Sequence, residues 1–152
     1  MAASGERESD EPRGDLATRT LAMPADANPS GDIFGGWVLS QMDIAGGITA
    51  GARAAGRVAT VAVDAMTFHR PVFVGDVLCV YADIIRIGRT SIAIHTEAWA
   101  LRGRQSERVK VTEGTFTFVA IDDQGQPRPV PPAPDQAPDK TKETSLNKEP
   151  AV

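Results

Sequence analysis

The chain has 152 residues, of which 41% are hydrophobic and 24% charged. This is the composition of a soluble globular protein with one real core. Its single cysteine, Cys79, excludes an internal disulfide and favours a reducing compartment. The first dozen residues are polar and acidic, unlike a secretory signal, and no apolar run approaches the ~18 residues that span a bilayer. We therefore expect a cytoplasmic protein with no membrane partner.

The net charge of −4 lies at the two ends of the chain. Between Leu16 and Arg128 there are 11 basic and 11 acidic side chains, which cancel. A neutral body offers little phosphate-neutralising surface, so we expect no nucleic-acid partner. Residues 1–14 contain few large apolar side chains, and residues 124–152 are rich in proline and charge. These compositions predict a disordered N-terminal tail over 1–14, one domain over 15–123 and a disordered C-terminal tail over 124–152.

In chain order, Leu16–Met23 reads as a short strand that ends at Pro24, and a loop rich in turn formers follows. Gly36–Ala55 reads as one long helix. Four residues recur along it at helical spacing: Trp37, Gln41, Ile44 and Ile48. Four alternating segments rich in Val, Ile and Thr then predict an antiparallel meander: Val58–Phe68, Val77–Ile87, Thr90–Leu101 and Val109–Ile121. The expected fold class is α+β, with a curved antiparallel sheet around one helix. A sheet this small leaves an edge to pair with a second subunit.

Asp43 is the first candidate for chemistry. It is the only charged side chain between Ile33 and Ala52, and its helical neighbours are Gly, Ala, Ser and Leu. Small neighbours let a ligand approach a carboxylate closely, although a merely structural aspartate explains the pattern about equally well. Glycines at a helix start, here Gly35 and Gly36, expose N–H groups to a ligand oxygen. Taken alone, these two glycines are better explained by tight backbone packing.

The remaining polar residues give weaker signals. Asn28 is typical of a turn, and His69 and His95 lie in strands where catalytic histidines are uncommon. Cys79 alternates into a strand as a small buried hydrophobe. No spacing predicts a metal site. The segment from Gly88 to Ser91 reads as a polar hairpin turn.

In combination, several motifs resemble the YciA-type acyl-CoA thioesterases, from about Asp15 to Pro131. They are Thr20-Leu-Ala-Met-Pro-Ala-Asp26, Asn28, Gly31-Asp-Ile-Phe-Gly-Gly-Trp37, Ser40-Gln-Met-Asp43, Met66-Thr-Phe-x-Arg-Pro-Val72, Val74-Gly-Asp-Val77, Thr90-Ser91 and Thr112-Glu113. The resemblance implies the hotdog fold, hydrolysis of acyl-CoA to a free acid and coenzyme A, no cofactor, and a homo-oligomer, commonly a trimer of dimers with sites between subunits.

The same resemblance assigns residues to the site. Asp43 matches the catalytic carboxylate, Asn28 a residue that places water or substrate across the dimer interface, and the Gly35 and Gly36 amides the group that polarises the carbonyl. The nucleotide end of coenzyme A is expected at five residues: Arg86, Gly88, Arg89, Thr90 and Ser91. Two alternatives are a non-catalytic acyl-CoA sensor and a hotdog hydratase or dehydratase. Neither the acyl chain length nor the choice between water activation and a covalent anhydride follows from the sequence.

Overall fold

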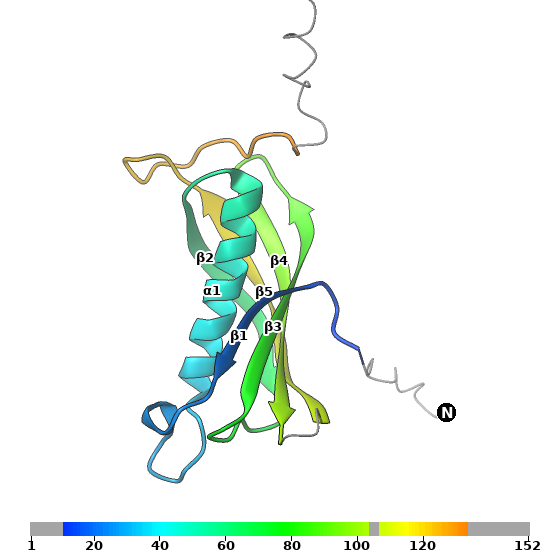
Figure 1. The fold of residues 1–152 in the computed structure, drawn as a ribbon. Coiled ribbons are helices and arrows are strands. Elements are labelled where there is room, and N and C mark those ends of the chain that lie inside the picture. Colours follow the sequence, from blue (N-terminus) through cyan, green and yellow to red (C-terminus); the bar gives the residue numbers. More distant parts are fainter. Residues whose placement is uncertain (1–10, 104–106, 134–152) are drawn as a thin grey trace, which may run out of the picture.

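A computed structural model describes residues 11–103 and 107–133 and consists of one long helix packed on a curved five-stranded sheet (Figure 1). The elements are β1 (Asp15–Leu21), a 3₁₀ turn (Pro24–Asp26), α1 (Gly35–Ala54), β2 (Val58–Phe68), β3 (Val77–Ile87), β4 (Ser91–Arg102) and β5 (Glu107–Ala120). These bounds confirm the expected helix and strands to within two residues at each end. No helix in the described part of the chain is long and apolar enough to cross a membrane.

The order of strands in the sheet is β1-β3-β4-β5-β2, with antiparallel pairing throughout. The expected meander of four strands is therefore wrong for β2, because only β3, β4 and β5 form one. β2 leaves the helix, pairs with β5 at the edge of the sheet, and the chain then crosses back to β3. Alternation alone predicts strands but not their neighbours, and the loop after β2 is too long for a tight hairpin.

The ends of α1 follow from local chemistry. Phe34 precedes the helix and offers no side-chain cap, so the first amides stay available. At the other end Ala55 adopts a left-handed conformation with φ of 51°, and Gly56 donates its N–H to the carbonyl of Gly51 at 3.2 Å. This closes the helix by the usual left-handed turn at a C-terminus.

The core lies between α1 and the inner face of the sheet. A glycine on the helix, Gly46, faces the ring of Phe118, and a Cβ at that position would lie 2.8 Å from the ring. The helix therefore sits closer to the sheet than any larger residue would allow. Ile44 and Ile48, which are spaced as a helical stripe, are instead 50% and 56% exposed. The buried face is formed by Val38, Met42, Ala45, Gly46, Ala50 and Ala54.

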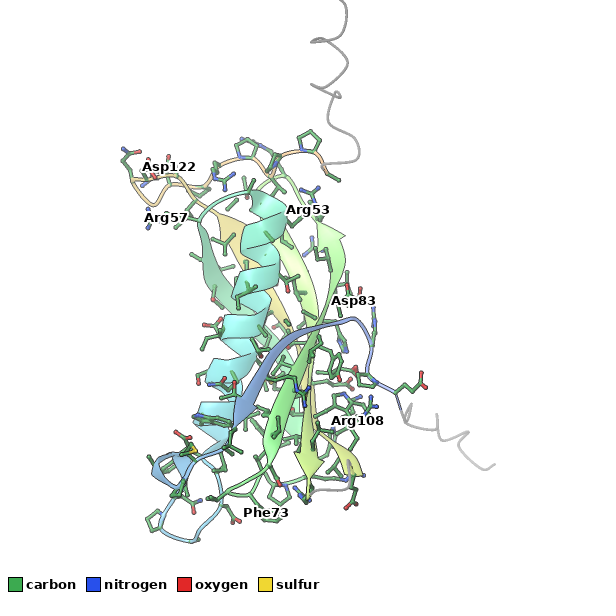
Figure 2. The ribbon with its side chains drawn as sticks, in the orientation of Figure 1. Arg53, Arg57, Phe73, Asp83, Arg108 and Asp122 are labelled. Atoms are coloured by element: carbon green, nitrogen blue, oxygen red, sulfur yellow. The ribbon has the colours of Figure 1, made fainter. Side chains whose placement is uncertain are left out.

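Packing continues past Asp123, where the sequence analysis placed the end of the domain. Val130 donates its N–H to the carbonyl of Arg89 at 2.9 Å, and Arg53 donates to the carbonyl of Pro131 at 2.6 Å. Arg128 donates to the carbonyl of Ala54, the last residue of α1, at 2.9 Å. Figure 2 labels Arg53 at this end of the helix, where the segment after β5 runs past it. Residues 134–152 lie outside the described part of the chain.

The N-terminal boundary also extends slightly beyond the expected one. Arg13 donates its backbone N–H to Glu97 at 2.7 Å, and its guanidinium pairs with Asp83, also at 2.7 Å. Ordered contacts therefore begin before Asp15, on the sheet face that points away from α1. The calls on residues 1–10 fall outside the described residues.

Candidate active site

A cavity of about 330 Å³ opens between α1 and β2. One face of the helix forms one wall, because residues three, four and seven positions apart share a side. The other wall comes from the sheet. The lining residues are Gly36, Leu39, Ser40, Asp43, Thr60, Val63 and Phe116. Asp43 is the one charged group among them, so the cavity combines apolar walls with a single carboxylate.

Thr60 on β2 donates its hydroxyl to Oδ1 of Asp43 at 2.6 Å. This bond ties the carboxylate to the strand, and Oδ2 has no hydrogen-bond partner within the described residues. No cation forms an ion pair with Asp43 among residues 11–103 and 107–133, which weakens the structural explanation considered above. The sequence analysis missed Thr60, because a threonine in a β-branched strand carries no signal until the strand is placed against the helix.

Gly36 lines the same cavity two turns before Asp43. The seven residues from Gly36 to Asp43 rise about 10 Å along the helix. A water bound to Asp43, followed by a substrate carbonyl that accepts a hydrogen bond from the Gly36 amide, spans roughly the same length. Within the described residues neither Gly35 nor Gly36 donates an amide hydrogen bond. A Cβ on Gly36 would meet nothing within 4 Å, so the helix start is open to a ligand.

Asn28 lies apart from these groups. Its side-chain oxygen accepts the backbone N–H groups of Ser30 at 2.9 Å and Asp32 at 3.1 Å. Asn28 therefore closes its own turn in the loop before α1, and it lines neither cavity next to that helix. A single subunit does not bring Asn28 into the cavity with Asp43.

The expected coenzyme A segment lies at the far end of the helix from Gly36 (Figure 1). Gly88 donates to the carbonyl of Ser91 at 2.8 Å and closes the hairpin between β3 and β4, while the carbonyls of Arg89 and Thr90 bind Val130 and Ala120. The Arg86 and Arg89 side chains are exposed. One subunit thus presents two cations on a rigid turn, separated from the carboxylate by about half the length of α1.

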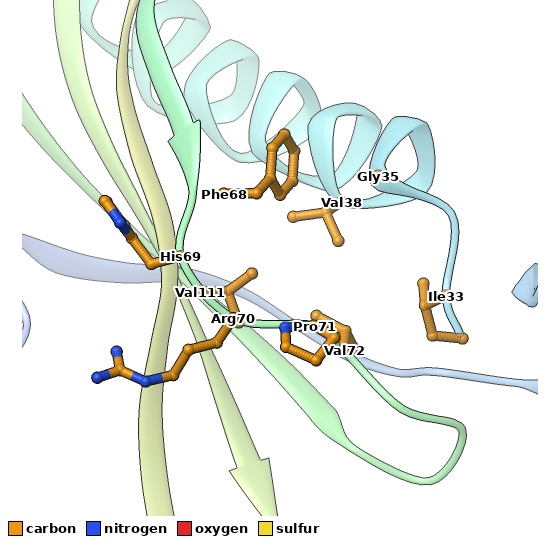
Figure 3. A pocket seen from close by; sticks show the side chains of 9 residues that line it. All are labelled: Ile33, Gly35, Val38, Phe68, His69, Arg70, Pro71, Val72 and Val111. Atoms are coloured by element: carbon orange, nitrogen blue, oxygen red, sulfur yellow. The ribbon is translucent and has the colours of Figure 1, made fainter. Parts of the chain in front are cut away.

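A second cavity, of about 340 Å³, opens at the start of α1 (Figure 3). It is bounded by the helix start, the end of β2 and the connection from β2 to β3. The lining residues are Ile33, Gly35, Val38, Phe68, His69, Arg70, Pro71, Val72 and Val111. Gly35 lines this cavity and Gly36 the first, so the two cavities lie on either side of the first turn of α1.

On the outer face of the sheet, candidate ligand atoms of His95, Glu97 and Glu113 lie within 4.8 Å of one another. Spacing along the chain gave no hint of this group. The ammonium of Lys110 lies 3.1 Å from Glu97 and 2.7 Å from Glu113, so a cation of the protein already neutralises these carboxylates. The hydrogen bond from Lys110 holds the pKa of Glu113 below its usual value. Burial lowers the pKa of Lys110, but its bonds to both glutamates outweigh that effect and raise it.

Cys79 is only 3% exposed and forms no disulfide, which confirms the expectation of a small buried hydrophobe. Burial raises the pKa of its thiol, although nearby Arg19 acts in the opposite direction. A buried thiol with a raised pKa is a poor nucleophile at neutral pH.

The model of the thioesterase superfamily matches residues 30–107. Over 123 residues the chain is 54% identical to the acyl-CoA thioester hydrolase YciA of Salmonella typhimurium, a match that covers 79% of this chain and 92% of the relative. The range 30–107 contains α1, β2 and the hairpin between β3 and β4.

Solved structures give the same result. The hexameric thioesterase of Yersinia pestis superposes with a TM-score of 0.78 at 54% identity, over 81% of this chain and all of that one (100%). An aspartate-to-alanine variant of a hexameric broad-specificity acyl-coenzyme A thioesterase superposes with the same TM-score of 0.78 at 48% identity, over 82% of this chain and 91% of that one.

Proposed function

Because the chain belongs to the thioesterase superfamily and is an acyl-CoA thioester hydrolase with the hotdog fold, we propose that Asp43 is the carboxylate that activates water for attack on the thioester. The observation that carries this proposal is the placement of Asp43, its Thr60 partner and the open Gly36 amide around one cavity. Together these groups supply an oriented base and a donor for the oxyanion, which is what thioester hydrolysis requires.

The reaction proceeds in two steps. A water bound to Asp43 gives its proton to the carboxylate while its oxygen attacks the carbonyl carbon, and negative charge develops on the carbonyl oxygen. The Gly36 amide, with Gly35 beside it, donates to that oxygen at the positive end of the helix. The intermediate then expels the coenzyme A thiolate, which takes up the proton from Asp43. Carboxylic acid and coenzyme A leave, and no cofactor takes part.

A direct attack by Asp43 on the carbonyl would instead form a mixed anhydride and release the thiolate first. We favour activation of water, because the rise of about 10 Å from Gly36 to Asp43 leaves room for a water between the carboxylate and a carbonyl bound at the Gly36 amide. A single turnover in ¹⁸O-water detects an anhydride that water opens at the carbonyl carbon of Asp43. Activation of water places the label in the product acid alone, whereas label recovered in the Asp43 carboxylate would indicate the anhydride.

The nucleotide end of coenzyme A is assigned to the hairpin between β3 and β4. Arg86 and Arg89 supply positive charge and the hydroxyls of Thr90 and Ser91 supply hydrogen-bond donors to phosphate, while Gly88 closes the turn that carries them. This proposal rests on the exposure of both arginines and on the resemblance noted above.

We assign the protein to a hexamer built as a trimer of dimers, with active sites between subunits. The two similar solved structures described above are both of hexameric enzymes. β2 lies at the edge of the sheet, and Val61 on it is 57% exposed, as suits a strand that pairs with a second copy. Asn28 of one subunit then approaches Asp43 of its partner. The cytoplasmic location stays a prediction.

The hydrolase function is supported over the two alternatives by the relatives, which are hydrolases. A sensor without catalysis would have no use for an oriented carboxylate beside an open amide. A hydratase or dehydratase would need a histidine at the helix start beside the reacting group. His69 lines the cavity at the helix start, but no histidine lines the cavity that holds Asp43.

The test is Asp43→Asn, which keeps the size of the side chain and removes the base. Release of free thiol from acyl-CoA should fall by roughly two to four orders of magnitude, with the melting temperature little changed. Asp123→Asn, in an exposed turn, is the matched control and should retain full activity. A folded Asp43→Asn enzyme with near-normal turnover would overturn the assignment.

A second experiment tests the shared site. Asn28→Ala and Asp43→Asn subunits, each inactive alone, are mixed under conditions in which subunits exchange. If the two residues serve one site from different chains, mixed dimers regain part of the activity because one site per dimer is intact. No recovery, with exchange demonstrated by mass spectrometry, would show that they act from one chain or that Asn28 has no catalytic part.

A further inference from the structure

The cavity at the start of α1 has no role in the chemistry described so far. Resting on the proposed function, we propose that it receives the acyl group of the substrate and that Val72 sets the longest chain that fits. The cavity adjoins the catalytic one through the consecutive residues Gly35 and Gly36. When the carbonyl oxygen of a thioester lies at these amides, one of the two groups on the carbonyl carbon can therefore reach this cavity.

The floor of the cavity is apolar. Val38 and Val72 are each 2% exposed and Val111 is fully buried, while Ile33 is 7% exposed. Figure 3 shows these side chains around the opening, with the side chains of His69 and Arg70 directed away from it. Arg70 donates to the carbonyl of Lys110 at 2.9 Å, so its guanidinium is held outside. The floor thus offers hydrocarbon contacts, while His69 and Arg70, which also line the cavity, lie away from that floor.

The floor is also rigid. The carbonyl of Val72 accepts the N–H of Ile33 at 3.0 Å, which ties the connection from β2 to β3 to the loop before α1. The same connection is fixed at Asp76, whose carboxylate accepts the Phe73 N–H at 2.9 Å and bonds the guanidinium of Arg102 at 3.1 Å. Figure 2 labels Phe73 at this end of the molecule. A wall held by backbone bonds can discriminate between chains by length.

Chemistry decides which end of the substrate enters. Coenzyme A carries phosphates, which an apolar floor without a cation would exclude. The hairpin between β3 and β4, whose residues include the exposed Arg86 and Arg89, lies toward the opposite end of α1. The acyl group is the apolar end, and its burial is favourable along its whole length. The cavity therefore selects uncharged acyl groups over those that end in a carboxylate.

The volume of the cavity limits the length of the acyl chain that it can hold. A space of about 340 Å³ holds at most about ten groups the size of a water molecule, comparable to a medium acyl chain. Each methylene moved from water into it should raise kcat/KM about fourfold. The ratio of kcat/KM for octanoyl-CoA to that for propionyl-CoA therefore measures how much of the cavity the substrate uses.

Two substitutions at Val72 test the proposal in opposite directions. Val72→Phe adds four carbons to the floor and should lower the octanoyl-to-propionyl ratio by roughly 100-fold, with the propionyl rate within a few fold of the unaltered enzyme. Val72→Ala removes two carbons and should raise the ratio for dodecanoyl-CoA against propionyl-CoA about four- to tenfold. Val72→Ala keeps the test decisive if the larger side chain prevents folding.

The matched control is Val80→Ala, a fully buried valine on β3 that lines neither cavity. It should lower stability as much as Val72→Ala and leave the chain-length ratios unchanged. Ratios at Val72 that stay within twofold of the unaltered enzyme, or that move no more than in Val80→Ala, would overturn the proposal. Failure of the proposed function has a different signature, since the unaltered protein would then release no thiol from any of these acyl-CoAs.

Discussion

A carboxylate needs a fixed direction before it can hold a water, and Asp43 gains that direction from a neighbouring strand. The Thr60 hydroxyl occupies Oδ1 at 2.6 Å, and the helix carries no other charge between Ile33 and Ala52. Thr60 is thus a positioning residue in the proposed mechanism. Its contribution should be visible in turnover more than in substrate binding, because the substrate is held elsewhere.

Thr60→Val keeps the shape of the side chain and removes the donor. We expect kcat to fall roughly 10- to 100-fold with KM little changed, the size of one lost hydrogen bond to a charged group. Steady-state kinetics with propionyl-CoA give both parameters. Thr60→Ser retains the hydroxyl and should recover most of the loss. Equal losses in both variants would assign Thr60 a packing role only.

The site could be predicted from the sequence only in part. Asp43 was identifiable because a lone charge stands out on a helix of small residues, and Gly36 because glycines begin that helix. Thr60 was not, since its partner lies 17 residues away and depends on which strand packs beside the helix. The position of Asn28 relative to Asp43 depends on a second subunit, which no periodicity within one chain describes.

At the scale of elements, the contact between α1 and the sheet depends on one glycine of a consecutive pair. A Cβ on Gly46 would lie 2.8 Å from the buried Phe118 ring, whereas one on Gly47 would lie 3.7 Å from it. The first distance requires the ring or the helix to move, and the second is ordinary contact. Substitutions at these two positions therefore distinguish the effect of core packing on stability from the effect of helix propensity.

Gly47→Ala should stabilise the protein by up to about 1 kcal/mol, the difference in helix propensity. Gly46→Ala gains the same propensity but overpacks the core, at a cost of about 1–3 kcal/mol, so it should be net destabilising. Urea denaturation of both variants measures the difference. A Gly46→Ala protein as stable as Gly47→Ala would show that the helix shifts without cost.

The elements themselves were predictable and their arrangement was not. Alternation and turn residues located five strands and the helix, because these signals are local. Placing β2 beside β5 depends on contacts between residues about 50 positions apart, such as Val63 with Phe116. The outward position of Ile44 and Ile48 has a similar origin, because Gly46 and Ala45 let the opposite face approach the sheet.

For the whole molecule, assembly and activity should be lost together. We expect light scattering to give the mass of a hexamer, and Val61→Lys on the exposed edge strand to lower both that mass and turnover, because a charge there opposes strand pairing. Val61→Thr, which keeps the β-branched shape, is the control. A monomer with full activity would contradict the shared site.

Stability should also depend on acid through the outer-face group of Glu113, Lys110 and Glu97. The folded protein lowers the pKa of Glu113 from its ordinary 4.5. Its contribution is therefore complete above that value and is lost as pH falls through the lowered pKa. The melting temperature should drop between pH 5 and 3, and Glu113→Gln should drop less steeply. Equal slopes for both proteins would exclude this origin.

The same group has a consequence for an enzyme that handles activated acyl groups. Thioesters transfer acyl groups to free amines, and lysine is the side chain that supplies one. Across residues 11–103 and 107–133 Lys110 is the only lysine, and the other strongly basic side chains are arginines, which stay protonated. The Lys110 side chain is 9% exposed and bonded to two carboxylates, and its pKa is raised, so its nitrogen has no lone pair to offer. The described part of the protein thus carries its positive charge on arginines and on one protonated lysine, which an acyl-CoA substrate cannot acylate.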